Sequence, residues 1–188
     1  KMIAMTDVRP AEPRKTAQVR FADGRTFEAP AGTPLAAYVR AAYPQPPCPI
    51  VALQVDGAVA ELGDPALHDL EAMPIDMTSG DGMRIYQRAV SFVLVVAVRE
   101  LFPEARVMID FAVALGGFFC QVRGRPPLSE AELQQVEERM RAIVAADAPI
   151  GRTTLPVDEA VALFAAQCYD DKVRLLQGNP PSEVTLYE

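Results

Sequence analysis

The stretch Ile50-Val-Ala-Leu-Gln-Val-Asp-Gly-Ala-Val-Ala-Glu61 decides the fold of the first part of the chain. Its first six residues form the apolar pattern of a buried strand. Asp56-Gly57 then supplies the strongest two-residue turn signal, and the chain returns over residues 58–61. The stretch therefore predicts a β-hairpin.

The segments on either side extend this hairpin into a small α+β unit. Upstream, residues 18–21 and 26–29 alternate on both sides of a hairpin turn. A short helix follows from Leu35, with Thr33 as its N-cap and Pro34 at its first helical position, and a proline run ends it. Downstream, residues 72–77 form a further strand. The predicted order is ββαββ, a turn and then β.

A long helix opens the rest of the chain. Asp81 is its candidate cap, it runs from about Met83 to Phe102, and its middle is apolar on nearly every side, which predicts burial between layers. A capping-box spacing, Ser129-Glu-Ala-Glu132, opens a second helix through about residue 146, with one buried stripe. The other elements expected are strands at 106–113, 118–122, 149–155 and 184–187 and helices at 156–167 and 171–177.

Composition narrows the class of protein. The chain has 188 residues, half of them hydrophobic and 23% charged, which is typical of a globular protein. Its net charge of -7 argues against a general nucleic-acid coat but allows a local basic face. The longest near-continuous apolar run, Ala89–Val98, is too short to span a bilayer, and residues 1–5 lack a signal-peptide block. We therefore expect a cytoplasmic protein with no membrane partner.

Cysteine and histidine usage excludes most catalytic centres. Cys48, Cys120 and Cys168 show no C-x-x-C spacing, so we expect reduced, mostly buried thiols. His68, the single histidine, lies in a turn-like connection and is expected at the surface. With these residues the sequence predicts no metal site and no catalytic residue.

Two resemblances cover about 170 residues. Residues 17 to about 78 resemble a TGS domain, a ubiquitin-like β-grasp module, at Phe21-Ala-Asp-Gly24, Ala31-Gly-Thr-Pro34 and Val51-Ala-Leu-Gln-Val-Asp-Gly57. The rest resembles the second additional domain of threonyl-tRNA synthetase, which in most bacterial members hydrolyses mischarged seryl-tRNA. Its matching stretches include Ala97-Val-Arg-Glu-Leu-Phe-Pro103, Gly116-Gly-Phe-Phe119 and Leu128-Ser-Glu-Ala-Glu-Leu133.

These resemblances imply an α+β protein with three parts. A flexible leader spans residues 1–16, a TGS β-grasp domain spans 17–80, and an editing-like α+β domain with a long central helix spans 81–188.

The departures from the synthetase pattern concern its hydrolytic residues. That domain carries His-x-x-x-His early in its long helix, and alignment on Ala97–Pro103 puts Arg88 and Phe92 at those two positions. A cation and a benzyl group cannot replace two imidazoles that bind metal or orient a water. The family's Cys-x-x-x-His motif would follow the last strand, beyond Glu188. We therefore expect no editing hydrolysis.

The same pair of domains also resembles the N-terminal half of bacterial uridine kinase-like proteins, in which a P-loop kinase domain follows. There the helix opens as Asp-Gly-x-x-x-Tyr-x-Arg, and this chain has Asp81-Gly-Met-Arg-Ile-Tyr86-Gln-Arg88. No G-x-x-x-x-G-K-[ST] motif occurs, so the phosphotransfer site, ATP and Mg would belong to a covalently continuous kinase domain outside these residues. This resemblance gives the preferred interpretation, a non-catalytic regulatory or ligand-binding module of a nucleoside-kinase-like protein.

The long helix carries the candidate ligand-binding cleft, formed by Arg84, Tyr86, Arg88 and Phe92. The arginines would bind phosphate, and the rings would form an apolar wall for a nucleotide or an RNA ligand. The alternative is a closed helix end, with Phe92 buried and Arg88 paired to a carboxylate. Arg123 and Arg125 could touch RNA or could be solvated loop charges.

Two further functions remain open beside the regulatory module. One is an RNA-binding module inherited from the synthetase, against which the net charge weighs. The other is a trans-editing hydrolase of mischarged tRNA, against which the single histidine weighs.

Overall fold

The structure is a computed structural model that describes residue 12 and residues 14–112, 117–178 and 180–188. The chain forms two compact units, Lys1–Pro127 and Leu128–Glu188. The division expected at residues 80 and 81 falls inside the first unit and stays a prediction. Most of the predicted leader lies outside the described residues.

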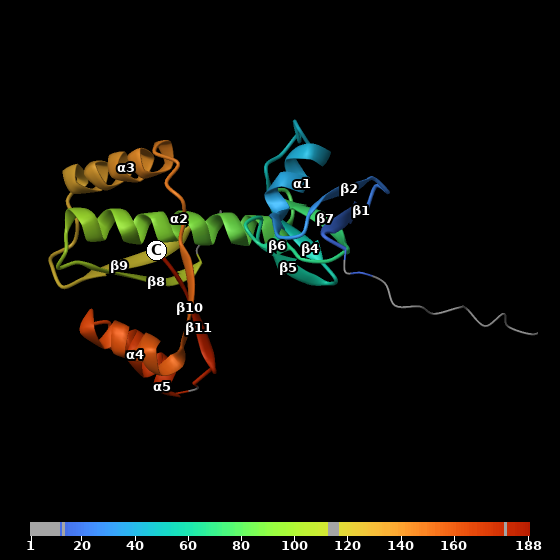
Figure 1. Ribbon diagram of the computed structural model, residues 1–188. Coiled ribbons are helices and arrows are strands. Elements are labelled where there is room, and N and C mark those ends of the chain that lie inside the picture. Colours follow the sequence, from blue (N-terminus) through green and yellow to red (C-terminus); the bar gives the residue numbers. More distant parts are fainter. Residues whose placement is uncertain (1–11, 13, 113–116, 179) are drawn as a thin grey trace, which may run out of the picture. The chain divides into compact units, whose positions relative to one another are not determined.

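A five-stranded sheet in the order β2-β1-β7-β4-β5 forms the first part of unit 1 (Figure 1). Its central strands, β1 and β7, are parallel, and its other pairs are antiparallel. This is the β-grasp arrangement, and the α+β class is confirmed. The strands are β1 (Thr16–Phe21), β2 (Thr26–Pro30), β4 (Ile50–Val55), β5 (Ala58–Ala60) and β7 (Leu70–Asp76).

Helix α1 (Leu35–Ala42) covers one face of this sheet and closes the main core. Alternation places Ala17, Val19 and Phe21 of β1 in that core, all of them almost completely buried. The Phe21 ring meets Tyr43 edge to face, with ring centroids 5.3 Å apart. The two-residue hydrophobic period therefore identifies the buried face of β1.

The expected cap of α1 is wrong. Pro34 holds the N-cap position and makes no side-chain cap hydrogen bond. Thr33 belongs to a two-residue strand, β3 (Thr33–Pro34), which pairs with β6 (Pro65–Ala66). The Thr33 hydroxyl donates to the carbonyl of Pro30 at 2.7 Å, so this bond closes the turn before the helix.

Helix α2 (Gly80–Leu101) follows β7 after three residues and contacts both β4 and β7. Ser79, and not Asp81, is its N-cap, since the Ser79 side chain accepts from the amide of Gly82. The expected burial on nearly every side is not met, because Gly82, Ala97 and Val98 are its buried residues. No helix among the described residues is long and apolar enough to span a membrane.

An antiparallel hairpin completes unit 1. It consists of β8 (Arg106–Ala112) and β9 (Phe118–Arg123), and β8 packs against α2. Both strands were predicted, although the expected end of the first, Val113, lies outside the described residues.

Unit 2 contains α3 (Glu130–Ala145), α4 (Val157–Ala166), α5 (Asp170–Gly178) and a two-stranded sheet of β10 (Arg152–Pro156) and β11 (Glu183–Tyr187). The capping box of α3 is confirmed, with Ser129 and Glu132 bonded in both directions. Of the stripe predicted on α3, Val136 is buried, whereas Leu133 and Val144 are more than half exposed.

The expectation of mostly buried thiols is also wrong. Cys48 is half-buried, and Cys120 and Cys168 are exposed. Cys168 has a φ of 58° and lies in the turn between α4 and α5. Local backbone conformation at this turn, which cysteine spacing does not encode, leaves its thiol at the surface.

Candidate functional site

The start of α2 is held to the end of β7 by a joint that we define as residues 76–82. Within it, the Asp76 carboxylate accepts from the amide of Thr78 at 2.9 Å and from its hydroxyl at 2.6 Å. The Thr78 side-chain bond, followed by the backbone bond, lowers the pKa of Asp76 below its usual value. Ser79 Oγ donates to the Asp76 carbonyl at 2.8 Å and accepts from Gly82 N at 3.0 Å. Four hydrogen bonds among Asp76, Thr78, Ser79 and Gly82 therefore hold the start of α2 against the end of β7.

Gly82 permits this close packing. A Cβ atom at this position would lie 1.8 Å from the carbonyl oxygen of Asp76. Only a residue without a side chain allows the backbone of α2 to approach that of β7 so closely. The Asp-Gly pair that resembles the kinase-like motif thus has a structural explanation in this chain.

The helical geometry of α2 separates the four residues of the predicted cleft. Arg84, Arg88 and Phe92 follow one another at four-residue spacing and share one face. Tyr86 lies roughly 160° around the axis from Arg88. Phe92 is half-buried, and Arg88 is exposed without a hydrogen bond or ion pair among the described residues. The cleft itself stays a prediction.

Arg84 pairs with a carboxylate on its own helix. Its guanidinium lies 2.8 Å from the carboxylate of Asp81, and both side chains are largely exposed. Such a surface pair contributes little to stability, so it leaves Arg84 available for exchange with another anion.

Charge is distributed unevenly along the chain. Residues 82–127, which include β8, β9 and all of α2 after Asp81, carry six arginines against three carboxylates, a net charge of +3. Residues 1–81 carry 7 basic and 11 acidic groups, and residues 128–188 carry 5 and 11. The net charge of -7 therefore conceals one basic segment, and this segment folds within unit 1.

Arg125 is not the solvated loop charge that was one expectation for it. Its side chain is 14% exposed, and its guanidinium lies 4.3 Å from the centre of the Phe102 ring and 3.8 Å from the Glu104 carboxylate. The contact fixes the end of β9 against the end of α2. Arg123, by contrast, is exposed as expected. Sequence alone could not find the Arg125 contact, because it joins residues 23 positions apart.

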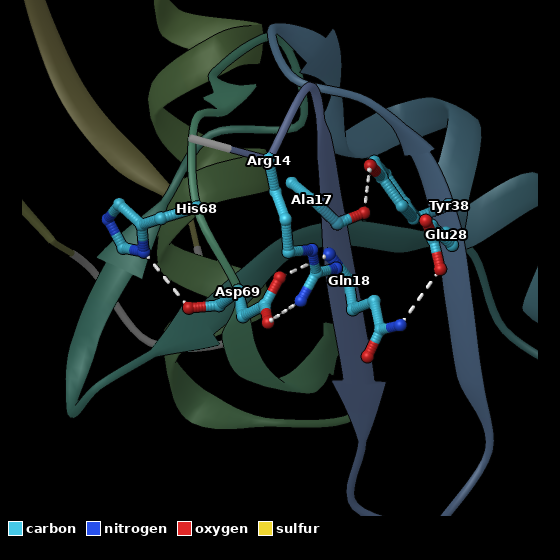
Figure 2. Close-up of polar contacts among 7 residues, drawn as sticks. All are labelled: Arg14, Ala17, Gln18, Glu28, Tyr38, His68 and Asp69. Carbon is cyan, nitrogen blue, oxygen red and sulfur yellow. Dashed lines mark hydrogen bonds and ion pairs between the residues drawn. The ribbon is translucent and has the colours of Figure 1, made fainter. Parts of the chain in front are cut away.

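A chain of polar contacts fixes the start of β1 in the β-grasp part (Figure 2). Asp69 accepts from Arg14 at 2.7 Å and from the amide of Gln18 at 2.9 Å. Gln18 in turn donates to Glu28 at 2.8 Å, and this bond is the main cause that lowers the pKa of Glu28. Arg14, which belongs to the predicted leader, is therefore tied to the domain.

His68 lies beside these contacts and is exposed, as predicted (Figure 2). Its Nδ1 lies 2.9 Å from the carbonyl oxygen of Asp69, a backbone group that forms no catalytic pair with it. Among the described residues, no three His, Cys, Asp or Glu side chains are placed to hold a metal ion.

The outer face of the sheet carries two shallow hollows, of about 450 and 580 Å³. Both are lined by Arg20, Gly24, Asp56 and Glu71. Arg20 and Glu71 are cross-strand neighbours whose charged groups lie 3.5 Å apart. Since the carboxylates here outnumber the arginine, these hollows are unsuited to a phosphate.

The turn between β1 and β2 is held by a second charged group, Asp23. Its carboxylate accepts from Arg25 Nε at 3.0 Å and from the Tyr43 hydroxyl at 3.2 Å. Arg25 also donates to the carbonyl of Ala42 at the end of α1 and lies over the Tyr43 ring. The side-chain bond from Arg25 is the largest cause that lowers the pKa of Asp23 from 3.8 to about 2.

Asp23→Asn is expected to lower the melting temperature at pH 7, since the carboxylate is stabilised in the folded chain. A depressed folded pKa contributes stability that is complete above the unfolded value of 3.8 and disappears as pH falls toward about 2. The difference between wild type and variant should therefore shrink between pH 4 and pH 2. Asp56→Asn in the other Asp-Gly turn is the matched control, and an equal pH dependence there would contradict the assignment.

The chain is similar to threonine–tRNA ligases. It is 33% identical over 135 residues to that of Polaromonas naphthalenivorans, 32% over 140 residues to that of Acidithiobacillus ferrooxidans, and 30% over 131 residues to that of Laribacter hongkongensis. These matches cover 70–73% of this chain, which spans about a fifth of the length of these curated relatives. No protein-family model matches the chain.

These relatives support the synthetase resemblance and give no support to the resemblance to uridine kinase-like proteins.

Proposed function

We propose that the chain is a tRNA-binding module related to the N-terminal domains of threonine–tRNA ligases, and that it binds without hydrolysing. The observation that carries the proposal is the net charge of +3 over residues 82–127 in an otherwise acidic chain. A surface that binds the RNA backbone needs local positive charge, and release of counterions supplies much of the affinity. The similarity to threonine–tRNA ligases supplies the class of RNA.

The residues on α2 support binding in preference to hydrolysis. Arg88 and Phe92 share a helix face at the positions where the resemblance places two histidines. Neither side chain can accept a proton from water at neutral pH, whereas the guanidinium of Arg88 can donate to phosphate oxygens. The same geometry that would present two imidazoles to one ligand here presents a cation and a ring.

The kinase-like interpretation rests on Asp81-Gly82 and on Tyr86 and Arg88. Gly82 is explained by its contact with Asp76, and Asp81 by its pair with Arg84. We therefore do not extend the proposal to a kinase domain, ATP or Mg.

Fluorescence anisotropy with a labelled acceptor-stem RNA hairpin tests the proposal. We expect binding that weakens steeply between 50 and 200 mM salt, and Arg88→Ala should weaken it about threefold to tenfold. Arg40→Ala is the matched control, because Arg40 is exposed on α1 in the acidic part and should change binding less than about twofold.

Two results would overturn this function. One is the absence of salt-dependent RNA binding by folded wild-type protein. The other is turnover of seryl-tRNA by purified protein that Arg88→Ala abolishes.

A further inference from the structure

Two arginines face each other at the open end of the β8–β9 hairpin. Arg106, the first residue of β8, is the direct cross-strand partner of Arg123, the last residue of β9. Directly opposed residues lie on the same face of an antiparallel pair, with Cβ atoms about 5 Å apart. Like charges directly opposite each other in an antiparallel pair are destabilising, so an anion bound between Arg106 and Arg123 would stabilise the hairpin.

The two faces of the hairpin differ in chemistry. Alternation places Val107 and Val122 on one face, and they are half-buried. The opposite face carries the arginine pair, followed by Met108 and Gln121 as the next cross-strand pair. The arginine pair therefore lies on the face opposite Val107 and Val122.

The side chain of Arg106 is anchored by the residues that precede β8, whereas that of Arg123 is exposed. Arg106 donates from Nη1 to the carbonyl of Pro103 at 2.9 Å and to that of Ala105 at 3.2 Å, which fixes the direction of its side chain. Arg123 is exposed and has no hydrogen bond or ion pair among the described residues. One guanidinium is thus anchored beside another that can move to meet a ligand.

A carboxylate close in sequence to Arg106, that of Glu104, pairs with a different arginine. Glu104 lies 3.8 Å from Arg125, whose guanidinium is packed on Phe102. Gly124, between Arg123 and Arg125, brings the chain against the carbonyl of Glu104. The Glu104 carboxylate is therefore an ion-pair partner of Arg125.

We propose that Arg106 and Arg123 together bind one phosphodiester group of an RNA backbone. The inference rests on the proposed function, because RNA is the polyanion that function supplies. Two guanidiniums on adjacent strands offer parallel donors to the two unesterified oxygens of a single phosphate. Such a contact fixes the register of the RNA on the protein and carries no base specificity.

If Arg106 and Arg123 bind the same phosphate, a double-mutant cycle of these two residues should give non-additive losses of RNA affinity. Arg123→Ala should weaken binding of the acceptor-stem RNA about threefold to tenfold and reduce the slope of log affinity against log salt by about one. Arg106→Gln should do the same, and the double variant should lose little more than either single one. Arg123→Lys should recover part of the affinity, because it restores charge without the planar fork.

The ligand-free protein gives a second readout. If the pair exists for an anion, Arg123→Ala should raise the melting temperature in chloride buffer, because it removes a repulsion. A dinucleotide with one phosphodiester should raise the melting temperature of wild type more than that of Arg123→Ala at equal ionic strength. A purely structural role for Arg123 predicts a lower melting temperature for the variant and no effect of the dinucleotide.

NMR of the arginine side chains separates failure of this site from failure of the proposed function. Titration of the dinucleotide should shift the Nε–Hε signals of Arg106 and Arg123 saturably, while that of Arg40 stays constant. Absence of saturable shifts overturns the site, as does full RNA affinity with an unchanged salt slope in Arg123→Ala. Saturable shifts in a protein that binds no RNA would retain the site and overturn the tRNA-binding function. Inorganic phosphate bound as well as the dinucleotide would replace the diester by free phosphate as the ligand and overturn the RNA assignment.

Discussion

Gly82→Ala should lower the free energy of unfolding by about 3 kcal/mol, near the upper end for overpacking in a closed site. The new methyl group would lie 1.8 Å from the Asp76 oxygen and 2.6 Å from the Asp76 carbonyl carbon. Both are backbone atoms, so no side chain can rotate to make room. Either α2 must separate from β7 or the bonds of the joint must break. Urea unfolding followed by circular dichroism measures the loss.

Gly80→Ala is the matched control for this prediction. Gly80 is the first residue of α2, and a Cβ there would meet no atom within 4 Å. Alanine is the better helix former, so this change should be neutral or stabilise the chain by up to about 1 kcal/mol. The two substitutions are chemically identical and two residues apart, yet their effects should have opposite signs. Equal destabilisation by both would show that the joint does not depend on close backbone contact.

Gly124→Ala is expected to have the second large effect. Gly124 has a φ of 85°, in the left-handed region, and a Cβ there would lie 2.3 Å from the carbonyl oxygen of Glu104. The backbone conformation costs an L-residue about 1–2 kcal/mol, and the clash adds a comparable amount. Because the strain falls between Arg123 and Arg125, RNA affinity should decrease together with stability.

Gly24→Ala separates the two causes. Gly24 has a φ of 86°, almost the same as Gly124, but nothing lies within 4 Å of its Cβ position. It should therefore show the backbone cost alone, about 2 kcal/mol less than the loss for Gly124→Ala, and RNA binding should be retained. Thermal unfolding and anisotropy measured on both variants check this. Equal losses in the two variants would remove the contact with Glu104 from the explanation.

Most of the β-grasp fold could be predicted because its information is local. Alternation identified the strands, and Asp-Gly turns at residues 23–24 and 56–57 joined them into hairpins. The parallel pairing of β1 with β7 joins residues about 50 positions apart, such as Val19 and Leu70, and no local pattern supplies it. The caps at Thr33 and Asp81 were wrong, because neighbouring residues compete for the same backbone amides and only three-dimensional geometry selects between Asp81 and Ser79.

In the candidate site too, features set by neighbouring residues could be predicted, whereas contacts between distant residues could not. Helical period places Arg84, Arg88 and Phe92 on one face, which the sequence could give. The same helical period places Tyr86 on another side of α2, although the predicted cleft included Tyr86 together with these three residues. The pairing of Arg106 with Arg123 needs the register of the hairpin, with its irregularity between Ile109 and Phe111, and the spacing of residues alone does not supply it. Sequence patterns do not predict contacts that depend on strand register, or contacts between residues far apart in the chain such as Arg125 and Phe102.

Because the joint fixes only the first turn of α2 to β7, a small tilt at the joint would produce a large displacement at the far end of this long helix. A helix of 22 residues extends about 33 Å, since each residue adds about 1.5 Å. The helix is bonded to Asp76 near its first turn, so a tilt of about 5° about Gly82 would move its far end by about 3 Å. That displacement is comparable to the length of a hydrogen bond. If α2 tilts as a rigid body, a small deformation of the β-grasp sheet would therefore move Phe102, over which Arg125 stacks, far enough to make or break a contact.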